Sequence, residues 1–253
     1  MQNIRIIPRL DIKGLNLVKG IHLEGLRVVG KPEKAALKYY QQGADELLFI
    51  DIVASLYGRN NLLELIQSTA QNVFIPLTVG GGIRNVDDIR NILRAGADKV
   101  AINTAVVNNP MLIKKAAETF GSQCVVVSIE TIKTGENKWE IFTENGREKT
   151  GIDTLEWADR VCDLGAGEIL LTSIDREGTK KGFENDLVNR IATKVPIPVI
   201  ACGGAGNPDH VRQVISDGCG DAVSIASILH YDQFGVADIK NYLESNDIRV
   251  RQA

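Results

Sequence analysis

The sequence predicts an α/β fold, a (βα)8 TIM barrel built from two duplicated half-barrels, and three observations support this expectation. The chain has 253 residues, a length typical of such barrels. Short β-rich runs alternate with amphipathic helical stretches, the pattern of repeated βα units around a parallel sheet. The segment Ile75–Gly96 also reappears without a gap as Ile197–Gly218, with eight identities in 22 positions. No proline-rich or polar linker divides the chain, so we expect one domain over residues 1–253, with half-barrels at about 1–121 and 122–253.

The elements are expected to alternate along the chain. Strands are predicted at Ile4–Asp11, Glu46–Asp51, Val73–Val79, Lys99–Asn103, Gln123–Ile129, Glu168–Ser173, Pro198–Cys202 and Ala222–Ala226. Helices are predicted between and after them, for example at Lys34–Gln42, Asn61–Gln71, Pro110–Phe120, Asp153–Leu164, Leu187–Thr193 and Val236–Leu243.

Two connections are longer than the usual turn between a strand and a helix. They run from Ile12 to about Gly30 and from Thr131 to Gly151, and the second contains a predicted hairpin turn at Asn145-Gly146. Both would emerge at the C-terminal end of the barrel strands, where barrels of this type place their chemistry. We therefore expect both connections to act as lids over this end of the barrel. The alternative is that they are insertions without a function.

Both copies of the repeat consist of a strand, a glycine turn and a helix. The glycine pairs are Gly81-Gly82 and Gly203-Gly204, followed by Asn85 and Asn207 as expected N-caps of the helices. Free backbone amides in such a turn bind phosphate well. The repeat thus predicts two phosphate sites, hence a substrate that is phosphorylated at both ends or large enough to reach both. The alternative is that the glycines only form tight turns.

Composition excludes several classes of function. The net charge is -3 with both signs mixed throughout, so nucleic acid is not an expected partner. No run of about 18 apolar residues and no charged leader is present, which predicts no membrane contact and a cytoplasmic protein. The four cysteines lack CxxC spacing and the three histidines are widely separated, so we expect no metal and no cofactor. Any catalysis must then depend on carboxylates, lysine and backbone amides.

The first predicted strand carries an unusual polar row. Because side chains alternate along a strand, Arg5, Ile7, Arg9 and Asp11 share one face. If this face points into the barrel, Asp11 ends the strand at the mouth, and Glu130 occupies the equivalent position half a chain later. Two carboxylates that face each other across the mouth would suit a general acid and a general base. The alternative is that each caps a loop or forms a local ion pair.

Other polar residues occur at strand ends. Those expected near the phosphate sites are Asp51, Asn103, Thr104, Thr172, Ser173, Asp175, Ala226 and Ser227. At the opposite, N-terminal ends of the strands lie Arg5, Glu46, Lys99 and Glu168. These four charges would form an ion-paired plug at the bottom of the barrel, or a layer that serves stability alone.

Six segments together resemble one enzyme family over almost the whole chain. They are PRLDIKG, ADELLFIDI, PLTVGGGIR, ADKVAINTAVVNNP, GEILLTSIDREGT and ACGGAG, and they are similar to HisF, the cyclase subunit of imidazole glycerol phosphate synthase. The resemblance implies a duplicated (βα)8 enzyme that takes ammonia from a glutaminase partner, HisH, docked on the bottom face. It also implies a phosphorylated small-molecule substrate.

The resemblance assigns roles to residues of this chain. It implies acid and base roles for Asp11 and Glu130. It implies substrate or phosphate binding by Lys19, Gly82, Asn103, Thr104, Gly178, Gly204, Ala226 and Ser227. It implies an ammonia gate of Arg5, Glu46, Lys99 and Glu168, with Asp98 as a docking residue.

The chain departs from the family's motif close to the expected chemistry. Glu130 stands where the family's motif has its second catalytic aspartate, and Arg9 stands where the motif has a small cysteine. A guanidinium at this position is expected to lower the pKa of the carboxylates and to obstruct the path of ammonia. Ala101 stands where the family's motif has a serine. The segment after the second strand also departs from the motif and reads Val53, Ala54, Ser55, Leu56, Tyr57.

These departures favour a HisF-like paralogue of surface-polysaccharide biosynthesis. Such a protein would use the same ammonia to turn an acetamido sugar into an acetamidino sugar, together with a third, amidotransferase-like protein. The alternatives are the cyclase of histidine biosynthesis and a catalytically silent ammonia conduit that activates the glutaminase. An isomerase of the related HisA type shares the barrel but works alone, and the four bottom charges argue against it.

Overall fold

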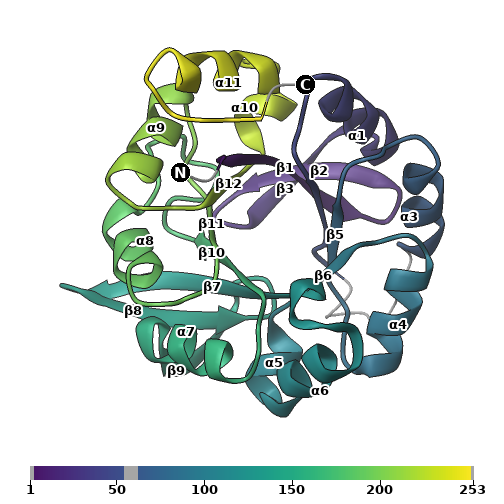
Figure 1. The fold of residues 1–253 in the computed structure, drawn as a ribbon, viewed down its shortest axis with the longest axis vertical. Coiled ribbons are helices and arrows are strands. Elements are labelled where there is room, and N and C mark those ends of the chain that lie inside the picture. Colours follow the sequence, from purple (N-terminus) through teal and green to yellow (C-terminus); the bar gives the residue numbers. More distant parts are fainter. Residues whose placement is uncertain (1–2, 54–61, 252–253) are drawn as a thin grey trace.

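The structure is a computed structural model that describes residues 3–53 and 62–251. Eight parallel strands form its centre: β1 (Arg5–Lys13), β4 (Leu47–Asp51), β5 (Leu77–Gly80), β6 (Lys99–Ile102), β7 (Val125–Gly135), β10 (Glu168–Ser173), β11 (Val199–Cys202) and β12 (Ala222–Ile225). Each strand pairs with the next in this order, and β12 pairs with β1, so the sheet closes on itself. The predicted (βα)8 barrel is confirmed (Figure 1).

Helices surround the barrel (Figure 1). In the described part of the chain they are α1 (Pro32–Gln41), α3 (Leu63–Ala70), α4 (Val86–Arg94), α5 (Thr104–Asn108), α6 (Met111–Phe120), α7 (Thr154–Asp163), α8 (Asn185–Ala192), α9 (Pro208–Ser216), α10 (Ser227–His230) and α11 (Val236–Glu244). A short 3-10 helix, η1 (Ser122–Cys124), precedes β7. The strands alternate with these helices as the sequence predicts.

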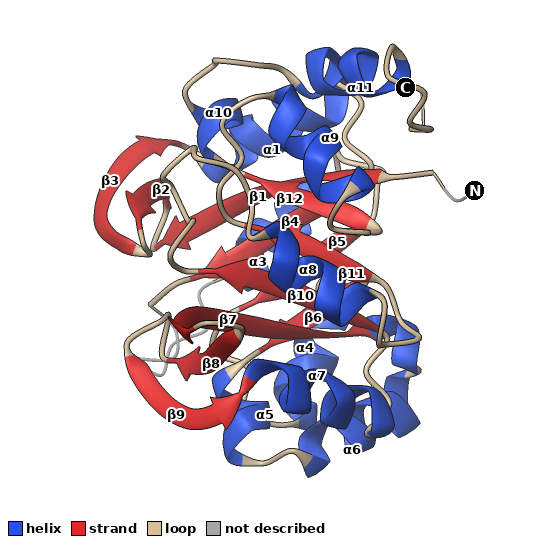
Figure 2. Ribbon diagram, turned by 90° about the vertical axis from the view of Figure 1, so that its left-hand side faces the viewer, coloured by secondary structure: helices blue, strands red, loops and turns tan. Residues whose placement is uncertain are grey.

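Both long connections form antiparallel ribbons that continue a barrel strand. β2 (Asn16–Ile21) pairs with β1 and with β3 (Glu24–Gly30), and β8 (Lys138–Thr143) pairs with β7 and with β9 (Glu148–Asp153). Figure 2 shows both ribbons at one end of the barrel, away from the N-terminus. The predicted turn at Asn145-Gly146 is confirmed, with φ angles of 58° and 78°.

The ribbons change where the first and fifth barrel strands end. β1 was expected to end at Asp11, but it runs on to Lys13 because Asp11 pairs with Val18 of β2. β7 likewise continues past Glu130. Asp11 therefore lies inside a paired strand, beneath the ribbon, and not at a free strand end.

Alternation along β1 separates two apolar layers. Ile6, Leu10 and Ile12 are fully buried in the large core between the barrel and its helices. Ile7 faces the other way, into the barrel, within a second cluster. That inner layer consists of Ile7, Leu48, Ala101, Val126, Leu170, Ile200, Cys202 and Ala222. The predicted inward row of β1 is thus present, with Ile7 packed in the inner layer.

The two copies of the repeat have the same local structure. Gly81 and Gly203 adopt positive φ angles of 98° and 92°, which L side chains rarely adopt. A Cβ on Gly81 would lie 2.2 Å from the carbonyl oxygen of Asp51, so this turn has no room for a side chain. Asn85 caps α4 by accepting from the amides of Asp87 and Asp88, and Asn207 caps α9 by accepting from the amide of His210.

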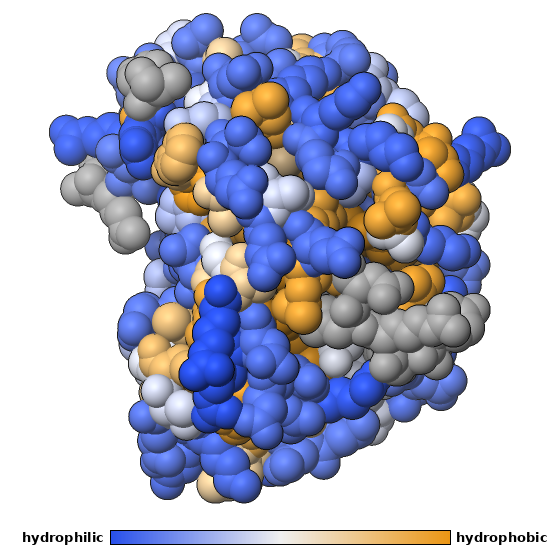
Figure 3. Space-filling model, turned by 90° about the vertical axis from the view of Figure 1, so that its right-hand side faces the viewer, coloured by the Kyte–Doolittle hydropathy of each residue, from blue (hydrophilic) through white to orange (hydrophobic). Residues whose placement is uncertain are grey.

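The surface is mixed in polarity. On the face in Figure 3, hydrophilic side chains predominate and hydrophobic ones form patches between them. Large exposed apolar side chains include Leu15, Ile21 and Val28 on the first ribbon and Phe74 after α3. Among the described residues, no helix has the length and apolarity needed to cross a membrane.

A buried ion pair joins the last helix to the bottom of the barrel. Lys240 of α11 donates to Asp45 Oδ1 at 2.7 Å and to the carbonyl oxygen of Arg251 at 2.6 Å. Asp45 Oδ2 accepts from the amide of Ile6 at 2.8 Å. Both charged side chains are almost fully buried, so neither is well solvated without the other.

We therefore expect Lys240→Met to lower the free energy of unfolding by about 3–5 kcal/mol, because Asp45 keeps a buried charge without its cation. Urea denaturation measures this. The matched control is Lys114→Met, whose exposed pairing with Glu118 at 3.9 Å should contribute less than about 1 kcal/mol. Equal losses in both variants would contradict the assigned role of the buried pair.

Candidate active site

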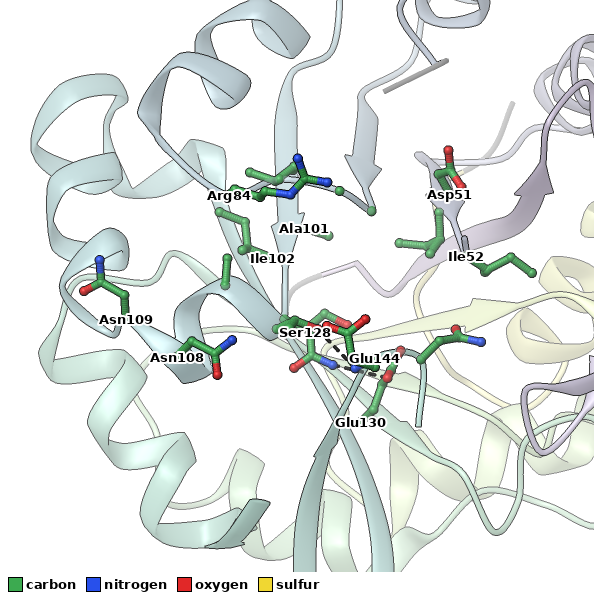
Figure 4. Close-up of a pocket in the computed structure, with 18 residues that line it drawn as sticks. Asp51, Ile52, Arg84, Ala101, Ile102, Asn108, Asn109, Ser128, Glu130 and Glu144 are labelled. Carbon is green, nitrogen blue, oxygen red and sulfur yellow. Dashed lines mark hydrogen bonds between the residues drawn. The ribbon is translucent and has the colours of Figure 1, made fainter. Parts of the chain in front are cut away.

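A cavity of about 390 Å³ opens at the C-terminal ends of β4 to β7. Five of the predicted site residues line it: Asp51, Gly82, Asn103, Thr104 and Glu130. Figure 4 shows Ala101, Ser128 and Glu130 around it, with Asp51 and Arg84 on the side of β4 and β5. The first glycine turn, the end of β6 and a carboxylate of β7 are thus brought together in one cavity.

Glu130 faces this cavity but is itself 6% exposed. Its Oε2 accepts a hydrogen bond from Asn103 Nδ2 at 3.2 Å. Burial, helped by nearby Asp11, raises the pKa of Glu130 to about 7, although Arg9, the amide of Gly146 and Asn103 act in the opposite direction. Glu130 is therefore placed to release or take up a proton near neutral pH.

Asp11 is held in a different environment. Arg9 Nε donates to Asp11 Oδ1 at 2.8 Å, and Lys19 Nζ lies 3.7 Å from Asp11 Oδ2. Burial alone would raise the pKa of Asp11, but Arg9 and Lys19 outweigh it and hold the pKa below its usual value. Arg9 was expected to lower the pKa of both carboxylates; it acts in that direction at Glu130 too, but burial outweighs it there and the pKa of Glu130 is raised.

Arg9 lies inside the barrel and is 3% exposed. Besides Asp11, its Nη1 lies 3.4 Å from Thr172 Oγ1 and 3.5 Å from Cys202 Sγ. Thr172, a predicted binding residue, is fully buried against Arg9. The described residues that line the cavity include neither Asp11 nor Thr172.

The first ribbon covers the mouth on the side of β1 and β10. Lys19 of β2 is 3% exposed and forms an ion pair with Glu177, which follows β10. Glu177 also accepts from the amide of Leu23 at 3.0 Å. Glu177 precedes Gly178, a predicted binding residue, but its pairing with Lys19 could not be foreseen because it is a long-range contact.

The second predicted phosphate site lies beneath this ribbon. A Cβ on Gly178 would lie 2.6 Å from the carbonyl oxygen of Gly20, so the ribbon packs directly on Gly178. The carbonyl oxygen of Gly204 accepts from the amide of Gly182 at 2.8 Å. Ala226 and Ser227 lie at the start of α10, where Ser227 is buried. These residues are absent from the described lining of the cavity, so only the first phosphate site opens into it.

A closed ring of charges occupies the other end of the barrel. Arg5 Nη1 lies 3.1 Å from Glu46 Oε2 and 3.0 Å from Glu168 Oε1. Lys99 Nζ lies 2.9 Å and 3.2 Å from the same two carboxylates. The four residues predicted as a plug thus form a ring in which each cation pairs with both carboxylates. Asp98 is exposed beside the ring and accepts from the amide of Leu77 at 2.8 Å.

Four of the residues at which the chain departs from the family's motif lie outside the part of the chain that the structure describes. Ala54, Ser55, Leu56 and Tyr57 lie outside the described residues, and only Val53 is described, where its amide donates to Asp51 Oδ1 at 3.0 Å. Within residues 3–53 and 62–251, no group of three or more His, Cys, Asp or Glu residues is arranged to hold a metal ion.

The raised pKa of Glu130 predicts a specific pH dependence of stability. The folded protein keeps a proton that the unfolded chain releases above about pH 4.5, so stability falls as the pH rises from there through about 7. Glu130→Gln should remove up to about 3 kcal/mol of this fall. Urea denaturation at pH 5 and pH 8 measures it, with exposed Glu118→Gln as control. An unchanged fall in the Glu130 variant would contradict the raised pKa.

Comparison with known proteins is consistent with this geometry. Residues 5–235 match the family described as "Histidine biosynthesis protein". The chain is 63% identical over 206 residues to the imidazole glycerol phosphate synthase subunit HisF of Legionella pneumophila, covering 81% of this chain and 97% of that protein. It is 50% identical over 247 residues to the subunit HisF of Bacillus cereus strain Q1, covering 98% of both chains. None of these names mentions sugar modification, so they support the cyclase alternative better than the favoured sugar paralogue. The chain belongs to the HisF family of imidazole glycerol phosphate synthase subunits, a family of enzymes.

Proposed function

We propose that this chain is a cyclase-type synthase subunit of imidazole glycerol phosphate synthase. It receives ammonia from a HisH-type glutaminase at the charged ring and uses it on a phosphorylated substrate at the mouth. The names of the relatives support this proposal. The single observation that carries it is that the ring and the cavity lie at opposite ends of one barrel interior. Lys99, the first residue of β6, belongs to the ring, and Asn103, which directly follows β6, lines the cavity.

The two carboxylates take different roles in this proposal. Glu130 acts as the general acid, since its pKa of about 7 leaves part of the population protonated at neutral pH. Asp11 acts as the base, since Arg9 and Lys19 keep it ionised. Divergent pKa values of neighbouring carboxylates are a usual sign of such a division.

The phosphate groups of the substrate bind at two places. Gly82, Asn103 and Thr104 hold one phosphate in the open cavity. The other binds at Gly178, Gly204, Ala226 and Ser227, which requires the first ribbon to move and Lys19 to leave Glu177. Asp51 contributes to the first of these phosphate sites and Thr172 to the second. Residues 1–121 and 122–253 act as duplicated halves of one domain.

A second candidate is conversion of an acetamido sugar into an acetamidino sugar, together with a third, amidotransferase-like protein. The observation that favours it is Arg9, which is ion-paired with Asp11 at a position where the family's motif carries a small cysteine. If the ion pair between Arg9 and Asp11 never opens, the chain is instead a catalytically silent ammonia conduit that only activates the glutaminase.

Complementation tests the choice between these candidates. The gene is placed in a histidine auxotroph that lacks the cyclase, with its own HisH-type partner. Growth without histidine is the result expected for the cyclase. Absence of growth, with a folded protein that still stimulates the glutaminase, would contradict it and would favour the sugar enzyme or the conduit.

Asp11→Asn separates catalysis from activation. The variant should still bind the glutaminase, because Asp11 lies at the opposite end of the barrel from the ring, but it should lose product formation. Glutaminase stimulation and product formation are measured on the same complex, with exposed Asp163→Asn as control. Unchanged product formation would show that Asp11 is not the base.

A further inference from the structure

A row of small polar side chains crosses the barrel interior on the mouth side of the inner apolar layer. Thr172 of β10 is in register with Cys202 of β11, and Cys202 is in register with Ser224 of β12. Their side chains face the interior, because the residues two positions earlier on these strands belong to the inner layer. All three residues are at most 6% exposed. Two hydroxyl groups and a thiol are thus enclosed within the barrel.

The hydroxyl group of Ser224 has no use within the described part of the chain. Its Oγ is buried and has no hydrogen-bond partner there. A buried hydroxyl group without a partner destabilises the fold, and a ligand that supplies the partner removes this cost. Ser224 is also in register with Ile7 of β1. Its hydroxyl group therefore lies beside the strand that carries Arg9.

The guanidinium of Arg9 uses few of its donors. Its Nε donates to Asp11 at 2.8 Å, but its Nη1 lies 3.4 Å from Thr172 Oγ1 and 3.5 Å from Cys202 Sγ, and such contacts are weak. Its Nη2 has no hydrogen-bond partner among the described residues. Because Cys202 neighbours both Arg9 Nη1 and Ser224, the unused donors of both residues lie on the same side of the interior.

The charges around these donors are already balanced. Arg9 pairs with Asp11, and Lys19 pairs with Glu177. All four residues are at most 5% exposed. A further anion would therefore be a buried charge without a partner of its own, whereas a neutral oxygen brings no net charge. The donors thus fit a neutral acceptor such as a carbonyl or amide oxygen.

We propose that Arg9 Nη2 and Ser224 Oγ bind a carbonyl or amide oxygen of the substrate when the first ribbon opens. This inference rests on the proposed function. Ala226, a residue of the second proposed phosphate site, stands two residues after Ser224. Residues two apart on a strand are separated by about 7 Å, so the oxygen lies on the order of 7 Å from this phosphate. Arg9 and Ser224 select substrates that carry a neutral oxygen at this place.

Two buried hydroxyl groups provide a matched pair of variants. Ser224→Ala removes the one in the barrel, and Thr69→Val removes Thr69 Oγ1 of α3, which is also buried without a partner in the described part of the chain. The probe is the substrate of imidazole glycerol phosphate synthase, titrated by calorimetry without glutamine or ammonia. Ser224→Ala should raise the dissociation constant about three- to tenfold, through loss of one hydrogen bond. Thr69→Val should leave it unchanged, and thermal unfolding should show that both variants stay folded.

Arg9→Lys tests the guanidinium. Lysine keeps a positive charge beside Asp11 but lacks the planar fork that presents Nη2, so the dissociation constant should rise about tenfold or more. A second measurement needs no knowledge of the substrate. The nitrogen-15 NMR signals of the Arg9 side chain, assigned with Arg9→Lys, should shift on addition of acetamide, which carries a neutral amide oxygen. They should shift less with acetate, the anion of the same shape.

The failure of this inference differs from the failure of the proposed function. If the unaltered chain does not bind the synthase substrate but acetamide shifts the Arg9 signals, the proposed function is wrong and the oxygen site stands. If the substrate binds and Ser224→Ala has no more effect than Thr69→Val, or Arg9→Lys has none, the oxygen site is wrong. A shift with acetate that exceeds the shift with acetamide, or no shift with acetamide, also overturns it.

Discussion

The ion pair between Arg9 and Asp11 is the interaction on which the rest of the site depends. Both side chains are 3% exposed, and an isolated charge in such a place would cost several kcal/mol. The structure compensates with Lys19 from the first ribbon and with Thr172 from the far side of the barrel. Three strands, β1, β2 and β10, are thereby tied to this ion pair, which fixes both the mouth of the barrel and the closed position of the ribbon.

This ion pair also separates the behaviour of two carboxylates that the duplicated fold places in equivalent positions. Asp11 is paired with Arg9 and has Lys19 beside it, whereas Glu130 accepts from the neutral amide of Asn103, and the pull of Arg9 on its pKa does not overcome burial. Burial is the largest effect at both sites, and only at Asp11 do opposite charges outweigh it. The asymmetry of the site therefore comes from the local partners of each residue.

Much of the fold follows from local sequence signals. The repeat predicts the glycine turns with their Asn85 and Asn207 caps, and period-two alternation predicts the inward row of β1. The first ribbon is missed as a pair of strands, because its glycines and mixed polarity hide the alternation. The partner of Lys19 and the pKa of Glu130 are also missed, because both depend on contacts across the barrel that no local pattern encodes.

Direct titration of the carboxyl group of Glu130 tests the account most sharply. Carbon-13 NMR of selectively labelled glutamate, with Glu130→Gln for assignment, follows this group from acid to neutral pH. Because burial dominates at Glu130, the expected midpoint lies at about 7, well above the ordinary value of 4.5. A midpoint near 4.5 would mean that Glu130 is ionised like Asp11, and the division of the two carboxylates into an acid and a base would be contradicted.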